Sequence, residues 1–318
     1  MIDRLIDKIR QTGNPTVVGL DPLYGMIPTK IKNTMLAKHG KTPQAAAEMF
    51  IAFNKGLIDA LYDIVPAVKP QIAMYEKYGF YGIRAYIETT SYAKEKGMFV
   101  IGDVKRGDIS STASAYASHL EGTEIEGEWF DIWNTDAVTL NPYMGYDAIE
   151  PFVKACNEKD KGVFILVKTS NQSSVDFQDV VVQSGSGSGG NETELLFETV
   201  AKHVSQWGAN AMGKNGYSKI CAVVGATSGT GVASADYRQK VRKLMPNTFF
   251  LIPGYGAQGG TAADIREMFD KDGGGCIVNS SRGIIAAHQK SDKYNDENFA
   301  DAAREAALAM KTDLLSAL

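Results

Sequence analysis

The chain has 318 residues, of which 44% are hydrophobic, and its formal net charge at pH 7 is -4. A chain of this length and composition can bury a large core, either as two ordinary domains or as one large α/β barrel. Lysine and arginine are scattered along the chain and acids are in slight excess, so no nucleic-acid partner is expected.

The first eight residues have the pattern of an amphipathic helix and lack the uninterrupted apolar core of a signal segment. No apolar run in the chain is long enough to cross a bilayer. We therefore expect a soluble, cytoplasmic protein with no membrane partner.

Eight short β-rich runs recur along the chain, and each ends in a polar or glycine-containing turn. The predicted strands are residues 16–21, 67–75, 98–105, 137–142, 162–169, 220–225, 249–253 and 276–279. The predicted helices are residues 43–62, 82–96, 109–119, 147–156, 192–207, 234–244, 262–269 and 298–314. Strict alternation with apolar strands is typical of a parallel sheet covered on both faces, and eight repeats favour a closed (β/α)8 TIM barrel over an open doubly wound sheet. One domain, 1–318, then accounts for the whole length.

Two segments interrupt this alternation. The Gly/Ser-rich stretch 183–190 cannot bury apolar surface, so we expect a flexible loop, either part of an active-site lid or a tolerated insertion. Residues 27–41 are expected to form a surface excursion after the first strand.

Charged residues gather where the first three strands end. In a barrel the carboxyl ends of the strands meet at one mouth, so the side chains there are considered together. Asp103 and Lys105 share one face of the third strand because side chains alternate, and Asp108 follows them. Asp21 ends the first strand and Lys69 lies on the second. Crowding these charges is costly. The alternatives are a structural ion-pair cluster or a solvated strand end, but the flanking apolar strand and the third acid, Asp108, favour a catalytic group.

Later strands end in residues suited to binding. Residues 168–171 after the fifth strand include Ser170 and offer short polar groups that can read an amide-like ring edge. The seventh and eighth strands lead into a glycine-rich segment with Gln258 and Gly260, and into Arg282. Glycines let the backbone approach an anion, and arginine matches phosphate oxygens, so a phosphate site is predicted here.

Histidine and cysteine offer no metal or acid–base site. The four histidines lie in predicted helices or loops away from the strand ends, and the three cysteines lack C-x-x-C spacing. Proton chemistry is therefore assigned to lysine, and no metal is expected.

These segments together resemble the orotidine 5'-phosphate decarboxylase family, in its longer bacterial form. The similarity spans nearly the full chain and rests on four motifs: Asp103-x-Lys105-x-x-Asp108-Ile109, Lys69-Pro70-Gln71, Pro253-Gly254-x-Gly256-Ala257-Gln258-Gly259-Gly260 and Asn279-Ser280-Ser281-Arg282-Gly283. The resemblance implies a homodimer with shared active sites that removes CO₂ from orotidine 5'-monophosphate to give uridine 5'-monophosphate, without metal or organic cofactor.

The resemblance also implies a role for each residue. Lys105 would protonate C6 as general acid, Asp103 would face the substrate carboxylate, and Lys69 would order the charges. Asp108 would enter the site of the other subunit. The remaining substrate contacts would be Asp21 and Lys69 on the ribose, Thr112 reaching across with Asp108, Ser170 on the pyrimidine edge, and Gln258 and Arg282 on the phosphate.

Two other functions fit parts of the pattern. A hexulose-phosphate synthase or related aldolase of the same barrel type uses a similar aspartate and lysine with a divalent metal, but Arg106, Gly107 and Gln258 argue against it. A non-catalytic barrel that binds a phosphate ligand has no reason to keep buried ions of both signs.

Overall fold

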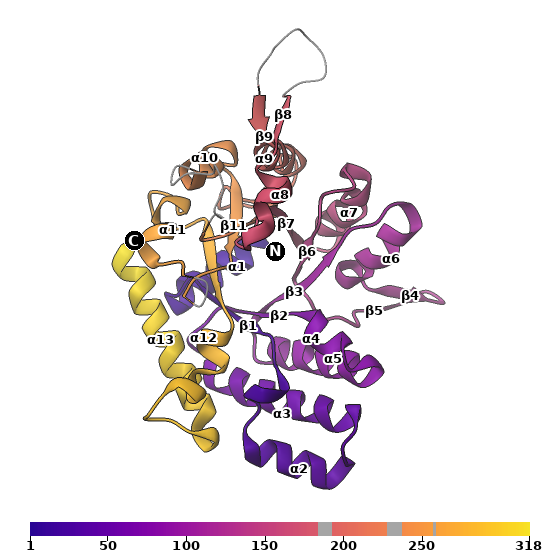
Figure 1. The fold of residues 1–318 in the computed structure, drawn as a ribbon. Coiled ribbons are helices and arrows are strands. Elements are labelled where there is room, and N and C mark those ends of the chain that lie inside the picture. Colours follow the sequence, from indigo (N-terminus) through magenta and orange to yellow (C-terminus); the bar gives the residue numbers. More distant parts are fainter. Residues whose placement is uncertain (184–192, 228–236, 257–258) are drawn as a thin grey trace.

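The computed structural model describes residues 1–183, 193–227, 237–256 and 259–318. Eight parallel strands form a closed barrel at the centre of the molecule, with helices around it (Figure 1). The strands are β1 (Thr16–Leu20), β2 (Ala67–Pro70), β3 (Phe99–Arg106), β6 (Ala137–Leu140), β7 (Gly162–Lys168), β10 (Ser218–Val224), β11 (Thr248–Ile252) and β12 (Cys276–Ser280). Each pairs with its neighbours along the chain, and β12 pairs with β1, so the predicted TIM barrel is confirmed.

The outer layer consists of helices that follow the strands. They are α2 (Thr29–His39), α3 (Pro43–Leu61), α4 (Ile72–Glu76), α5 (Gly79–Glu95), α6 (Ser110–Glu121), α7 (Glu150–Glu158), α8 (Val175–Gln178), α9 (Leu196–Trp207), α10 (Tyr237–Leu244), α11 (Ala262–Ile265), α12 (Arg282–Ile285) and α13 (Phe299–Ala317). Local signals fix several starts: Thr42 caps α3, with Pro43 in its first turn. The surface excursion expected at 27–41 contains α2, which has no buried residue.

The second strand is shorter than the predicted 67–75. It ends at Pro70, and Gln71 then caps α4 by accepting a hydrogen bond from the amide of Ala73. The apolar residues after Gln71 are buried by a helix instead of a strand, because short apolar runs fit either structure.

The barrel interior is filled by one apolar cluster. Every strand contributes to it: Val17, Ala67, Phe99, Ile101, Ala137, Phe164, Cys221, Val223, Phe249, Leu251 and Ile277. The amphipathic helix α1 (Ile2–Thr12) adds Ile2, Leu5 and Ile6. Met1 packs against Gly162 at the start of β7, so α1 closes the amino end of the barrel and leaves the carboxyl end as the mouth.

The same interior alternation brings polar residues to the mouth. Asp103 is two residues after Ile101, and Lys69 is two residues after Ala67, so each continues the interior face of its strand. Thr139 follows Ala137 and Asn279 follows Ile277 at the same spacing. The barrel thus places polar groups directly above an apolar floor.

Two hairpins extend from this frame (Figure 1). One pairs β4 (Thr123–Ile125) with β5 (Glu128–Phe130), and the other pairs β8 (Val181–Gln183) with β9 (Thr193–Leu195). Sequence patterns missed both because strands of three residues carry little periodicity. The predicted Gly/Ser loop, apart from Gln183, lies outside the described residues. Among the described residues, no helix is long and apolar enough to cross a membrane.

Candidate active site

Three charged side chains meet at the ends of β2 and β3. The Nζ of Lys69 donates to Oδ2 of Asp103 at 2.5 Å, and the Nζ of Lys105 donates to Oδ1 of the same carboxylate at 2.5 Å. Lys69 and Asp103 are buried, whereas the side chain of Lys105 is 44% exposed. The array therefore consists of a buried ion pair, Lys69 with Asp103, and one more exposed ammonium, that of Lys105, at the mouth of the barrel.

Thr139 holds this array from the neighbouring strand β6. Its hydroxyl donates to Oδ1 of Asp103 at 2.9 Å and accepts from the backbone amides of Val104 and Lys105, both at 3.0 Å. The backbone of Lys105 is in the left-handed region, with φ of 47°, which is costly for a residue with a β-carbon. Thr139 therefore binds both the carboxylate and the strained turn that aims Lys105.

The charges set one another's ionisation. Burial by itself would raise the pKa of Asp103, but the ammonium groups of Lys69 and Lys105 hold that pKa well below its usual range. Burial would lower the pKa of Lys69, but Asp103 and Asp21 raise it above its usual value. Asp103 thus stays a carboxylate and Lys69 stays an ammonium at neutral pH.

Asp21 links this array to a cavity of about 330 Å³. The charge of its carboxylate helps to raise the pKa of Lys69, and its Oδ1 is buried without a hydrogen-bond partner among the described residues. The same cavity is lined by Arg282, whose guanidinium makes no hydrogen bond or ion pair within the described part of the chain. The carboxylate of Asp21, beside the charged array, and the guanidinium of Arg282 therefore line the same cavity.

The loop after β11 forms one wall of that cavity. Pro253, Gly254 and Tyr255 line it. The amide of Gly260 donates to the carbonyl of Gly254 at 3.1 Å, and a β-carbon on Gly260 would lie 2.8 Å from that oxygen. Gly260 is thus required for a tight turn and uses its own amide within it. Gln258 lies outside the described residues.

The loop after β7 carries Ser170. A β-carbon on Gly225, at the end of β10, would lie 2.8 Å from the amide nitrogen of Ser170, so the two segments are in close contact. Thr169 and Gln178 exchange two hydrogen bonds across the loop, at 2.9 and 2.8 Å. Ser170 is therefore carried by a loop that is tied to itself and packed on the next strand.

Asp108 and Thr112 lie apart from the array. Asp108 follows β3, and its carboxylate accepts only from the amide of Ile109, at 2.8 Å, among the described residues. Thr112 is exposed on α6, and Ile109 is 41% exposed. Within one chain, neither Asp108 nor Thr112 joins the other candidate residues that the structure describes.

A sequence profile of the orotidine 5'-phosphate decarboxylase / HUMPS family matches residues 52–296. This chain belongs to that family. Orotidine 5'-phosphate decarboxylase of Clostridium tetani is 40% identical over 100% of this chain and 99% of its own length. That of Petrotoga mobilis is 41% identical over 99% of this chain and 98% of its own. The structure of Leishmania donovani OMP decarboxylase has a TM-score of 0.71 at 28% identity, covering 99% of this chain and 97% of the other.

In this member of the orotidine 5'-phosphate decarboxylase family, three residues near the candidate site were given no role from the sequence: Thr139, Asn279 and Lys168. Thr139 could have been found from its spacing to Ala137 on an apolar strand. Asn279 lies in a motif that was noted, and its Oδ1 is buried without a partner among the described residues. Lys168 was also noted, but its partner Asp179 is eleven residues away and had no sequence signal.

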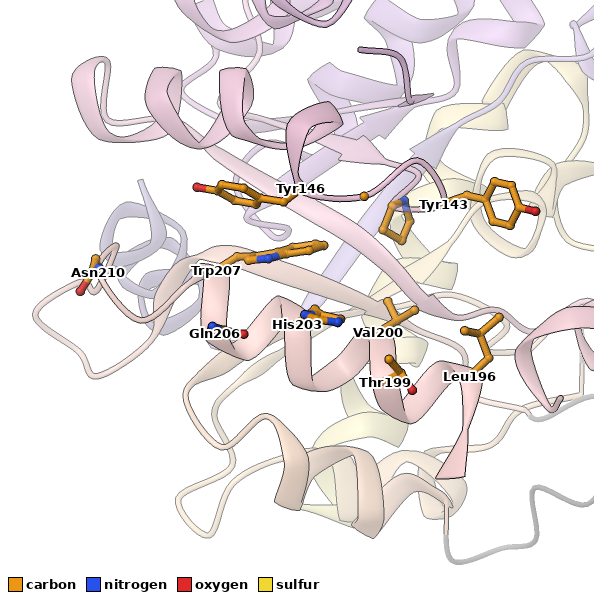
Figure 2. A pocket seen from close by; sticks show the side chains of 11 residues that line it. Tyr143, Tyr146, Leu196, Thr199, Val200, His203, Gln206, Trp207 and Asn210 are labelled. Carbon is orange, nitrogen blue, oxygen red and sulfur yellow. The ribbon is translucent and has the colours of Figure 1, made fainter. Parts of the chain in front are cut away.

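A larger groove, of about 840 Å³, lies outside the barrel between the loop after β6 and α9 (Figure 2). Tyr146 and Trp207 face each other there, with ring centroids 5.5 Å apart, and His203 stacks on Trp207. Among the described residues that line this groove there is no acid, lysine or arginine, so they do not supply the charges that decarboxylation requires. The candidate charged residues Asp21 and Arg282 line the smaller cavity instead.

Proposed function

We infer that this chain is a carboxy-lyase of pyrimidine biosynthesis that converts orotidine 5'-monophosphate to uridine 5'-monophosphate. The observation that carries this conclusion is the carboxylate of Asp103 held between Lys69 and Lys105, in a chain whose full-length relatives are decarboxylases. The roles given below to individual residues are part of the proposal.

Lys105 acts as the general acid. Loss of CO₂ from an sp² ring carbon leaves a carbanion in the ring plane, which the π system cannot delocalise. A fixed ammonium stabilises that charge and then donates its proton to C6. The exposed side chain of Lys105, at the mouth and 2.5 Å from Asp103, supports this role.

Asp103 faces the substrate carboxylate, and Lys69 keeps the charges ordered. Because its pKa is depressed, Asp103 remains negative beside a bound carboxylate, and their repulsion is relieved as CO₂ departs. Lys69 is buried and ionised, so it prevents Asp103 from moving or taking a proton. Thr139 supports the same carboxylate oxygen that Lys105 contacts.

The nucleotide lies along the cavity between the array and Arg282. Arg282 binds the phosphate together with Gln258, and the turn closed by Gly260 gives that phosphate room. Asp21 and Lys69 bind ribose hydroxyls, which would supply the donor that the buried Oδ1 of Asp21 lacks among the described residues. Ser170 reads the pyrimidine edge.

Two copies of the chain form a homodimer in which Asp108 and Thr112 enter the partner's site. The carboxylate of Asp108 has no cation beside it among the described residues of its own chain. A β-carbon on Gly107 would lie 3.0 Å from the carbonyl of Asn141, so the loop with Asp108 adjoins the loop with Tyr143, which is 81% exposed. Exposed Ile109 and Tyr143 thus lie on the same two adjoining loops as an acid without an ion-pair partner among the described residues, as expected for an interface.

We further propose that the chain folds as one barrel domain and needs no metal or organic cofactor. The test is turnover of orotidine 5'-monophosphate by chelator-treated protein, followed through the change in pyrimidine absorbance. Full activity after chelation supports the decarboxylase. A metal-dependent reaction with a pentulose phosphate would instead indicate the aldolase, which the full-length relatives do not favour, and binding without turnover would indicate a silent barrel.

A further inference from the structure

A second buried ion pair lies at the base of the loop that follows β7. The Nζ of Lys168 donates to Oδ1 of Asp179 at 2.6 Å and contacts the hydroxyl of Ser174 at 3.4 Å. The side chains of Lys168 and Asp179 are 0% and 5% exposed, so water cannot replace either partner. The ring of Phe197 on α9 lies 5.7 Å from the ammonium and helps to cover it.

The ion pair and the Thr169–Gln178 hydrogen bonds join adjacent positions of the loop. Lys168 pairs with Asp179, and the next residue inward on each side, Thr169 with Gln178, forms two further hydrogen bonds. The segment between them, 170–177, is therefore closed at its base by charged and polar bonds in succession. Such a closed loop has few ways to move relative to β7.

The position of Ser170 follows from these bonds at the foot of the loop. It is the first residue beyond the closed base, and on its other side it rests against Gly225 at the end of β10. The carbonyl of Lys168 accepts from the amide of Gly225 at 2.8 Å, so the same lysine joins both supports. A shift of Lys168 would therefore move Ser170 relative to the end of β10.

We propose that Lys168 and Asp179 are positioning residues that set Ser170 against the pyrimidine of the bound nucleotide. This proposal rests on the role given above to Ser170. The pair does not contact the substrate; it determines where a neighbouring hydroxyl and its backbone stand. Ion pairing serves this purpose because it is directional and, once buried, cannot be exchanged for water.

The experiment compares a ligand that carries the pyrimidine with one that lacks it. Binding of uridine 5'-monophosphate and of ribose 5-phosphate is measured by calorimetry for the wild type, Lys168→Met and Asp179→Asn. Uridine 5'-monophosphate should bind about tenfold more weakly to each variant, the loss of a typical hydrogen bond, whereas ribose 5-phosphate should bind as before. The KM for orotidine 5'-monophosphate should rise in parallel.

Asp136→Asn is the matched control. Asp136 is equally buried and binds Lys94 and Arg4, but it lies at the amino end of the barrel. The Asp136→Asn variant should be less stable than the wild type, but the ratio of its affinities for uridine 5'-monophosphate and ribose 5-phosphate should be unchanged. Equal weakening of both ligands by Lys168→Met, or no weakening, would overturn the proposal. If the single variants do not fold, Lys168→Met/Asp179→Leu removes both charges together and is judged by the same ratio.

The binding ratio also separates this proposal from the proposed function. If the wild type binds uridine 5'-monophosphate more tightly than ribose 5-phosphate but does not turn over substrate, the decarboxylase activity is contradicted. The variants then still test the positioning role of Lys168 and Asp179. A wild type that does turn over, with variants that keep the normal ratio, would contradict only the role of Lys168 and Asp179.

Discussion

The carboxylate of Asp103 is bound by the ammonium of Lys69 at 2.5 Å, and the two side chains are only 8% and 6% exposed. Removing one member of such a pair leaves the other as an uncompensated buried charge, so both are fixed by the fold as well as by the chemistry. The Lys105 ammonium, which is more exposed, can be removed with much less damage to the fold. Variants of Lys69 or Asp103 therefore change both the stability of the fold and catalysis, whereas variants of Lys105 chiefly change catalysis.

Lys105→Ala should lower turnover by on the order of 10²–10⁴-fold or more, because it removes the proton donor and the charge that stabilises the carbanion. Binding of uridine 5'-monophosphate should remain measurable. Steady-state kinetics and calorimetry test both statements, with Lys161→Ala, which alters a lysine at the start of β7, as control. Near-native turnover by Lys105→Ala would remove its catalytic role.

Arg282→Ala should weaken nucleotide binding by about 1.5–3 kcal/mol, the contribution of a hydrogen bond to a charged group. Its effect should depend on the phosphate, because Arg282 faces the cavity without another partner among the described residues. Binding of uridine, which has no phosphate, should be unchanged. An unaltered KM and turnover would place the phosphate elsewhere.

Thr139→Val should lower kcat by about tenfold through loss of the hydroxyl that binds Asp103 and the amide of Lys105. The left-handed turn at Lys105 would then lose its support. Thr135→Val is a suitable control, since it removes a buried hydroxyl that donates to the carbonyl of His119. If both variants lower kcat equally, Thr139 has no special part in aiming Lys105.

Mixing Lys105→Ala and Asp108→Ala subunits tests the shared site. Random exchange makes half the dimers mixed, and each mixed dimer would hold one intact site, so about one quarter of wild-type activity should return. Activity is measured before and after exchange, which native mass spectrometry verifies. Verified exchange without recovery would contradict the action of Asp108 in the partner's site.

Asp103→Asn should change how stability depends on pH. The pKa of Asp103 is lower in the folded protein than in the unfolded chain, so its ionisation stabilises the fold at neutral pH. That contribution is lost as the pH falls below the ordinary carboxyl pKa of about 3.9 toward the folded value. Urea unfolding should show a gap between wild type and variant that narrows below about pH 4; a constant gap from pH 7 to 3 would contradict this.

Local sequence patterns predicted much of the site as well as the fold. Alternation along a strand is a property of the extended backbone, so Asp103 and Lys105 could be assigned to one face of their strand before any partner strand was known. Parallel order then placed Asp21 and Arg282 at the same mouth. These predictions needed only the strand pattern and the rule that carboxyl ends converge.

Contacts between segments were not predictable in this way. The left-handed backbone of Lys105 and its support by Thr139 depend on how β3 and β6 align, and the register between them shifts after Gly102. The pairing of Lys168 with Asp179 depends on the path of a loop that has no periodic pattern. The sequence by itself determined which residues face the mouth, because that follows from backbone geometry; the tertiary structure decided which of them touch, because distance between strands and loops is set only when the barrel closes and packs.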